Sequence, residues 1–131
     1  MGLAEKRKAE SIKTQDLPKF ESKLNEIAGY PIAVEINWDT FTAFDQYPLD
    51  RLVNFVFGDI TNFVKKICVD DMGKEALKEK LTSIHISNTD QDDEYSMELK
   101  DNGLYLTEKL VGGSFGNHRT DVIFNYVEPL L

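Results

Sequence analysis

Apolar residues recur every three or four positions in several parts of the chain, which is the pattern of an amphipathic helix. The first of these stripes starts after Asp16 and Pro18, two residues that suit the first turn of a helix, and it ends before Gly29 and Pro31. The longest stripe has eight apolar residues between Leu49 and Ile67. The spacing predicts helices over residues 17–28, 49–67 and 76–81.

Four other segments alternate between apolar and polar residues, which is typical of a strand with one buried face. They cover residues 32–38, 84–88, 95–100 and 104–107. The turn Asp101-Asn102-Gly103 predicts that the last two strands form a hairpin, because Asn-Gly suits a tight turn. Trp38 continues the alternation of the first strand, and we expect it to be buried.

Residues 120–128 fit both a helix and a strand, because their branched and aromatic side chains favour a strand while their spacing also forms a helical face. With a helix there, the order is helix-strand-helix-helix-strand-strand-strand-helix. Helices cluster in this order instead of alternating with strands. The sequence therefore predicts an α+β fold, with a mostly antiparallel sheet of about four strands and helices packed on one face.

The domain organisation follows from the length and from the distribution of apolar residues. We expect a single domain over residues 1–131, because a chain of this length can form one hydrophobic core. Residues 1–15 are rich in charge and poor in apolar anchors, so we expect them to form a partly frayed helical extension.

The negative charge of the chain argues against partners that are themselves strongly negative. The sequence has 23 acidic and 15 basic residues and a formal net charge of −8. Duplex nucleic acid and anionic membranes bind clustered Lys and Arg, so neither is expected as a partner. No apolar run is long enough to predict a membrane span.

The single cysteine and the first residues of the chain indicate the cellular compartment in which the protein is expected. Cys68 cannot form an internal disulfide, and a lone thiol is typical of a reducing compartment. Its apolar neighbours favour a buried and inert thiol over a reactive one. The first eight residues end in four charged residues, and no apolar run of a secretory signal follows them. We therefore expect a cytoplasmic protein.

Residues 34–39 (VEINWD) and 67–77 (ICVDDMGKEAL) resemble segments of an uncharacterised family of small bacterial cytosolic proteins. The resemblance extends over nearly the whole chain, including Pro18 and the segment Gly29-Tyr30-Pro31. It implies a single bacterial cytosolic domain. It implies no activity, and no functional residue is carried over from the family.

The outward-facing residues of the predicted strands form a candidate binding face. If the strand at 32–38 pairs with the strand at 84–88, a histidine lies beside a carboxylate, and a tyrosine and a second carboxylate share the same face. One interpretation is an acid–base set, and the other is a solvated sheet face with cross-strand pairs. The candidate residues are Glu35, Asn37, His85, Ser87, Glu98 and Tyr105.

The glycine-rich segment 112–116 is a candidate anion site, because free backbone N–H groups before a helix can bind an anion. Gly113 and Gly116 would supply such groups, and His118 and Arg119 would add charge. The alternative is a plain flexible turn. The segment also matches the spacing of a hydrolase nucleophile motif, but the order of the remaining triad residues is wrong for a hydrolase.

No metal or cofactor is expected from the sequence. The acidic residues at positions 90–94 do not match the ligand spacing of a calcium loop, and two histidines with one cysteine do not form a structural zinc site. This segment is expected to be a solvated acidic loop.

The leading functional hypothesis is a small non-enzymatic bacterial domain that acts through protein–protein contacts, as a homodimer or with a basic protein. Phe55 lies off the apolar stripe of its helix and is a candidate interface residue. One alternative is a small-molecule-binding domain or weak enzyme that uses the sheet face around His85. A second alternative is an immunity-type protein that covers a basic toxin.

Overall fold

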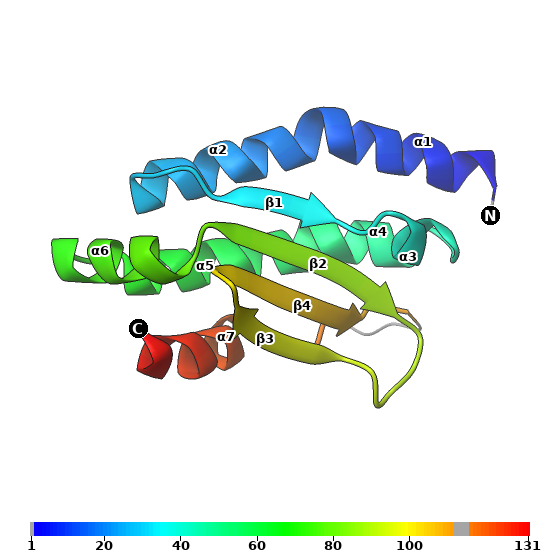
Figure 1. Ribbon diagram of the computed structural model, residues 1–131. Coiled ribbons are helices and arrows are strands. Elements are labelled where there is room, and N and C mark those ends of the chain that lie inside the picture. The colour runs from blue at the N-terminus through cyan, green and yellow to red at the C-terminus, as the bar shows by residue number, and fades with distance from the viewer. Residues whose placement is uncertain (1, 112–115) are drawn as a thin grey trace.

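The computed structural model describes residues 2–111 and 116–131, and Figure 1 shows its elements. The helices are α1 (Leu3–Ser11), α2 (Leu17–Ala28), α3 (Asp39–Thr42), α4 (Tyr47–Arg51), α5 (Phe57–Ile67), α6 (Asp71–Lys80) and α7 (Thr120–Val127). The strands are β1 (Ala33–Ile36), β2 (Ser83–Thr89), β3 (Ser96–Lys100) and β4 (Gly103–Lys109). Two π-helical segments, η1 (Ile12–Asp16) and η2 (Leu52–Val56), lie within the longer helices, and a 3₁₀ turn, η3 (Glu128–Leu130), follows α7.

The predicted α+β class is confirmed. The elements follow the predicted order, with two additional short helices, α3 and α4, after β1. Within the described residues, the four strands form one sheet in the order β1-β2-β4-β3. The sheet is mixed, however, because β1, β2 and β4 run parallel and β3 alone is antiparallel to β4. β1 and β2 are parallel because the connection between them passes through four helices and returns the chain to the same end of the sheet. β2 and β4 are parallel because the chain reverses twice, through β3 at the edge, before β4 lies beside β2.

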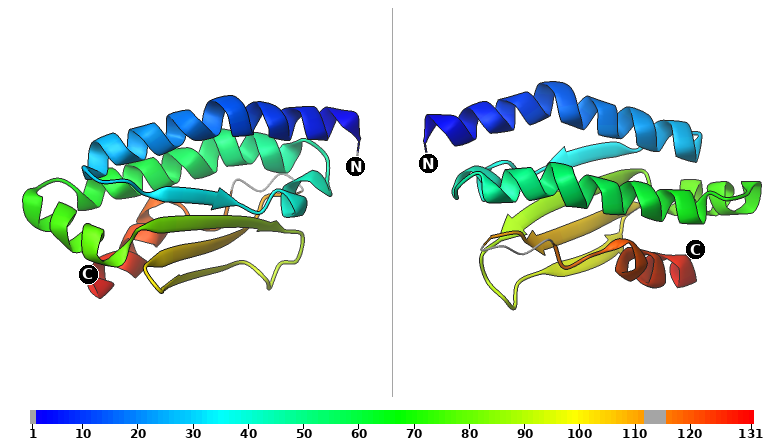
Figure 2. Two further views of the ribbon diagram at one scale, coloured as in Figure 1. Left: turned by 45° about the horizontal axis from the view of Figure 1, so that its top comes forward. Right: turned by 180° about the vertical axis from the view of Figure 1, so that it is seen from behind.

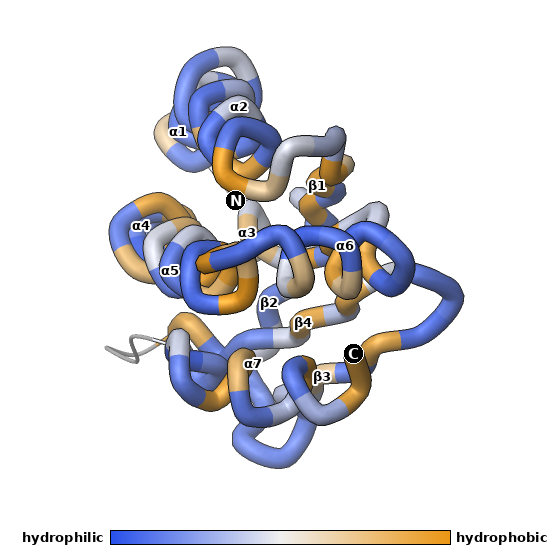
Figure 3. The backbone as a smooth tube through the Cα atoms, turned by 90° about the vertical axis from the view of Figure 1, so that its left-hand side faces the viewer, coloured by the Kyte–Doolittle hydropathy of each residue, from blue (hydrophilic) through white to orange (hydrophobic). Residues whose placement is uncertain are grey.

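The helices and the sheet form two layers. Helices α1, α2, α4, α5 and α7 lie on one side of the sheet, as Figures 2 and 3 show, and the hydrophobic core lies between the layers. The inward side chains of β2 and β4 are fully buried against this layer. The opposite face of the sheet, which we call the outer face, is not covered by a helix of the described chain.

The first helix begins before the predicted position. Residues 3–28 form one long helical rod, and Asp16 does not cap it, since it lies inside the rod and its side chain makes no cap hydrogen bond. The π segment explains how Pro18 is tolerated there. In η1 the N–H of Leu17 donates to the carbonyl of Ile12, five residues earlier, which widens the turn just before the proline ring. Ala9 and Ile12 are buried against the core.

Two aromatic side chains that the sequence analysis singled out are half-buried. Phe55 lies in the π segment η2, with the guanidinium of Arg51 6.0 Å from its ring centre, and its role as an interface residue stays a prediction. Trp38 is also only half-buried, because β1 ends at Ile36 and the chain turns there into α3.

The C-terminal segment is a helix, and α5 holds its first turn. The Asp59 carboxylate of α5 accepts hydrogen bonds from the backbone N–H of Thr120 at 3.1 Å and from its hydroxyl at 2.7 Å. The same carboxylate accepts a hydrogen bond at 2.9 Å from the Arg119 side chain. A side chain distant in sequence therefore supplies the acceptor that a cap residue normally provides.

No helix in the described part of the chain is long and apolar enough to cross a membrane.

Asp59→Ala should lower the free energy of unfolding by about 1–2 kcal/mol, because two donors at the start of α7 lose their acceptor. Chemical denaturation followed by circular dichroism measures this loss. Asp121→Ala is the control, since Asp121 is exposed and solvent screens its ion pair with Lys66, which should therefore contribute much less to stability than the Asp59 hydrogen bonds. Equal losses in the two variants would show that Asp59 does not hold α7.

Candidate functional site

Four of the predicted outer-face residues form one row across the whole sheet. Glu35 of β1 pairs in register with His85 of β2, His85 with Tyr105 of β4, and Tyr105 with Glu98 of β3. The row follows from the alternation of the strands, which directs every second side chain away from the core. Asn37 and Ser87 lie two residues further along on the same face.

His85 is the centre of this row. Its Nδ1 atom lies 3.0 Å from Oε2 of Glu35, and its Nε2 atom lies 2.9 Å from Oγ of Ser83. The Tyr105 ring stacks on the imidazole, with ring centres 4.2 Å apart and 6° between the planes. The imidazole is thus held on three sides, although Glu35 itself is 72% exposed.

The Glu35 carboxylate determines the tautomer of neutral His85. A carboxylate only accepts hydrogen bonds, so the proton of the neutral imidazole lies on Nδ1. Nε2 then has a free lone pair that accepts the hydrogen bond from the Ser83 hydroxyl. The resulting chain, from Ser83 through His85 to Glu35, has the donor and acceptor order of a nucleophile, a base and an orienting carboxylate.

Ser83, Gly103 and Lys100 belong to this cluster, and the sequence analysis missed all three. Ser83 pairs in register with Gly103, and Gly103 pairs with Lys100, whose ammonium lies 5.0 Å from the centre of the Tyr105 ring. The sequence could have indicated Ser83, because it lies two residues before His85 and residues two apart in a strand share a face. The predicted strand began one residue too late to include it.

Gly103 lets the cluster assemble. A Cβ atom at this position would lie 2.9 Å from the Tyr105 ring and 3.0 Å from the Ser83 hydroxyl oxygen, which is closer than such contacts allow. The confirmed hairpin delivers this glycine to the start of β4, since Asp101 and Asn102 take the positive φ angles of 51° and 62° that a tight primed turn requires. The absence of a side chain at Gly103 thus allows Tyr105 and Ser83 to converge.

The cluster borders an open depression of about 320 Å³ on the outer face. Of the six predicted face residues, five line it and Glu98 lies outside it; the lining residues are Glu35, Ile36, Asn37, His85, Ile86, Ser87 and Tyr105. The depression is small and open, so it can accept one side chain or a small ligand group and cannot enclose a large molecule.

The second candidate, the anion site, lies on the other side of the sheet. Gly113 is outside the described residues, and Gly116 has a φ of 117°. The backbone N–H of His118 donates to the Glu108 carboxylate at 2.9 Å, and a Cβ on Gly116 would lie 2.5 Å from the same carboxylate. In the described part of this candidate site, the Glu108 carboxylate thus lies beside Gly116 and the N–H of His118, while the Arg119 side chain contacts Asp59.

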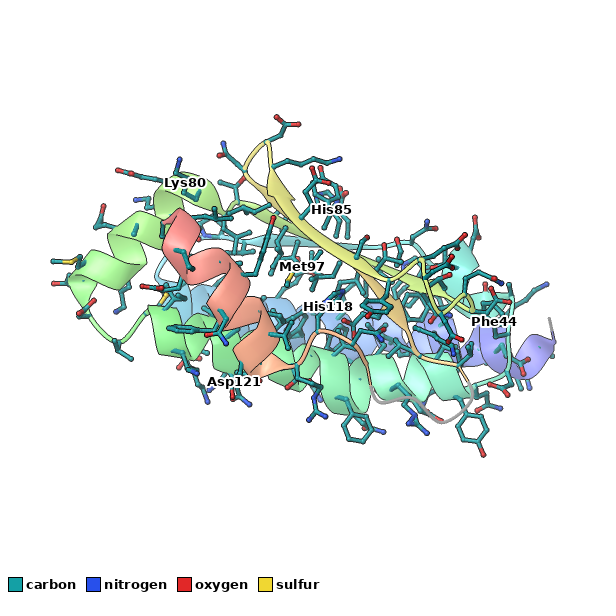
Figure 4. The ribbon with its side chains drawn as sticks, turned by 90° about the horizontal axis from the view of Figure 1, so that it is seen from below. Phe44, Lys80, His85, Met97, His118 and Asp121 are labelled. Carbon is teal, nitrogen blue, oxygen red and sulfur yellow. The ribbon has the colours of Figure 1, made fainter. Side chains whose placement is uncertain are left out.

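Glu108 and His118 are both buried, and Figure 4 shows His118 on the helix side of the sheet and His85 on the outer side. Burial raises the pKa of the Glu108 carboxyl to about 7, although hydrogen bonds from the backbone of His118 and Asn117 partly oppose this shift. Burial lowers the pKa of His118. Near neutral pH, burial therefore favours the neutral form of His118, while the Glu108 carboxyl is divided between its protonated and ionised forms.

The remaining candidates for chemistry concern metals and the thiol. The described residues contain no group of three or more His, Cys, Asp or Glu side chains that could hold a metal ion. Burial raises the pKa of the Cys68 thiol, which reduces its nucleophilic thiolate fraction.

The raised pKa of Glu108 predicts how the free energy of unfolding changes with pH. Between pH 4.5 and about 7 the folded protein holds a proton on Glu108 that the unfolded chain has lost, so this residue's contribution to stability falls as the pH rises. Glu108→Gln should remove that fall. The unfolding free energy of the variant minus that of the wild type should increase by about 2–3 kcal/mol from pH 5 to pH 8.

Urea denaturation at several pH values measures this difference. His118 acts in the opposite direction, because its lowered pKa makes stability rise with pH, and taking the difference between variant and wild type removes most of its contribution. Glu26→Gln, at an exposed position on α2, is the control. A difference that stays constant with pH would show that Glu108 is ionised in the fold.

Comparison of the chain with family models, with curated proteins and with solved structures finds no match. The resemblance to a family of small bacterial proteins therefore stays a prediction.

Proposed function

We propose that the chain is a protein-binding domain that contacts its partner through the outer face of the sheet. The carrying observation is the uncovered row from Glu35 to Glu98, which presents a stacked aromatic pair between two exposed carboxylates. Tyrosine and histidine offer a large rigid contact area together with polar atoms, which suits a protein interface.

Charge supports a basic partner. The Glu35 and Glu98 side chains are 72% and 61% exposed, and the exposed acidic loop at residues 90–94 follows directly after β2. Lys100 partly offsets Glu98, with 3.8 Å between the ammonium and the carboxylate. Surface carboxylates of this kind accelerate encounter with a cationic protein and exclude acidic ones. A second copy of this acidic chain is a weaker candidate for the same reason.

The same features fit the narrower hypothesis of an immunity-type protein that covers a basic toxin. The single buried Cys68 and the acid excess support a cytoplasmic location and argue against nucleic acid as a partner. Only the sequence resemblance supports a bacterial origin.

A second candidate function is a weak enzyme or small-molecule-binding domain at the same face. The observation that favours it is the hydrogen-bonded chain from Ser83 through His85 to Glu35, which lies beside the depression. A solvated sheet face does not require this order of donors and acceptors.

Photo-crosslinking tests the binding face. A benzophenone amino acid at position 98 should form a cross-link with a basic protein in the native cells, because this position is the exposed end of the row. The rival surface is the apolar end of the molecule, where Val69 and Met72 are 78% and 81% exposed. A cross-link formed from position 72 and absent from position 98 would make the proposed face wrong.

Charge reversal then tests the electrostatics with the cross-linked protein as the probe. The double variant Glu35→Lys/Glu98→Lys should lower the association rate constant at least about tenfold at low salt and weaken its salt dependence. Glu26→Lys/Glu79→Lys makes the same change in net charge on exposed helical positions. Equal effects of the two double variants, measured by stopped-flow or biosensor kinetics, would assign the effect to net charge and contradict the face.

A further inference from the structure

We propose that Ser83 is a nucleophile that accepts an acyl or phosphonyl group from a small activated ester or fluoride. This inference rests on the second candidate function and is independent of protein binding. It adds a reactive atom to the outer face and names the class of compound that this atom attacks.

The hydrogen bonds around His85 give the hydroxyl its base. Nε2 of His85 lies 2.9 Å from the Ser83 oxygen, within the range required for a general base. Nδ1 lies 3.0 Å from Glu35, whose negative charge stabilises the imidazolium that forms when the base takes the proton. The stacked Tyr105 ring holds the plane of the imidazole between these two partners.

The neighbours of Ser83 in the sheet leave room for a reacting group. Its register partners are Ala33 on β1 and Gly103 on β4, so only small residues lie directly opposite it in the two adjacent strands. The Tyr105 ring and the Ser83 hydroxyl border the same space above Gly103, and a reacting group reaches the hydroxyl from the side that the ring leaves open. Ser83 and His85 are half-buried and remain accessible from the outer face. Lys100, next in the same row, adds a positive charge that attracts an anionic oxygen.

The chemical step is a displacement at the activated centre. With a fluorophosphonate, the Ser83 oxygen forms a bond to phosphorus, the phosphorus–fluorine bond breaks, and fluoride leaves. The hydroxyl proton passes to Nε2 of His85 and then to water. We expect slow single modification of the protein, because the backbone N–H groups of this region take part in strand pairing and are not arranged as an oxyanion site.

Labelling of the full chain with a fluorophosphonate probe tests the proposal. Mass spectrometry of the intact protein and of its peptides should find one adduct per chain, located on Ser83. Ser83→Ala should abolish the adduct, and His85→Gln should lower the labelling rate about a hundredfold, which is the usual range of base catalysis. Glu35→Gln should give a rate between those of His85→Gln and the wild type.

Ser22→Ala, an exposed serine on α2, is the matched control and should label at the wild-type rate. Thermal unfolding of each variant by circular dichroism verifies that it is folded. The proposal is overturned if no adduct forms on Ser83, if the adduct forms on Tyr105 or Lys100 instead, or if folded His85→Gln labels as fast as the wild type. Cross-linking from position 98 in Ser83→Ala tests protein binding separately, so failure of one inference leaves the other measurable.

Discussion

The one-sided burial of β2 is the constraint on which the rest of the structure depends. Its inward residues Ile84 and Ile86 are almost completely buried beneath the helical layer, with β1 and β4 on either side. Because strand side chains alternate, fixing these two residues inward forces Ser83 and His85 outward. A shift of the register by one residue would bury the polar side chains and expose the isoleucines. The energy of the core therefore holds the outer face in position.

Alternation made much of the outer face predictable from the sequence. The row from Glu35 to Glu98 required only the phase of each strand and the pairing of β1 with β2. Strand direction was not predictable in this way, since alternation is the same in parallel and antiparallel strands. The direction depends on the helical connection that precedes β2 and on the insertion of β4 between β2 and β3, and the antiparallel expectation was therefore wrong for two of the three strand pairs.

The features that sequence reasoning missed share a physical origin in local departures from ideal geometry. Asp16 does not begin a helix, because the helical rod already begins at residue 3 and the π segment η1 carries it past Pro18. The cap of α7 comes from Asp59, sixty-one residues before Thr120, and no local motif encodes it. Glu108 follows the inward positions of β4, and a longer predicted strand would have placed a carboxylate in the core.

The two faces of the sheet differ in how far their polar side chains are exposed to solvent. On the helix side, the Glu108 carboxyl accepts backbone hydrogen bonds, and burial raises its pKa. This group therefore acts on the stability of the fold. Outside, the Glu35 side chain remains largely solvated, so its contact with His85 involves no large desolvation cost. An exposed residue such as Glu35 contributes little to stability, so it can be substituted without loss of the fold. Glu108 cannot, because the core packs around it. On this physical ground, the outer face is where a partner or a reaction can be accommodated, and the presence of Gly103 beneath Tyr105 and Ser83 keeps that face compact.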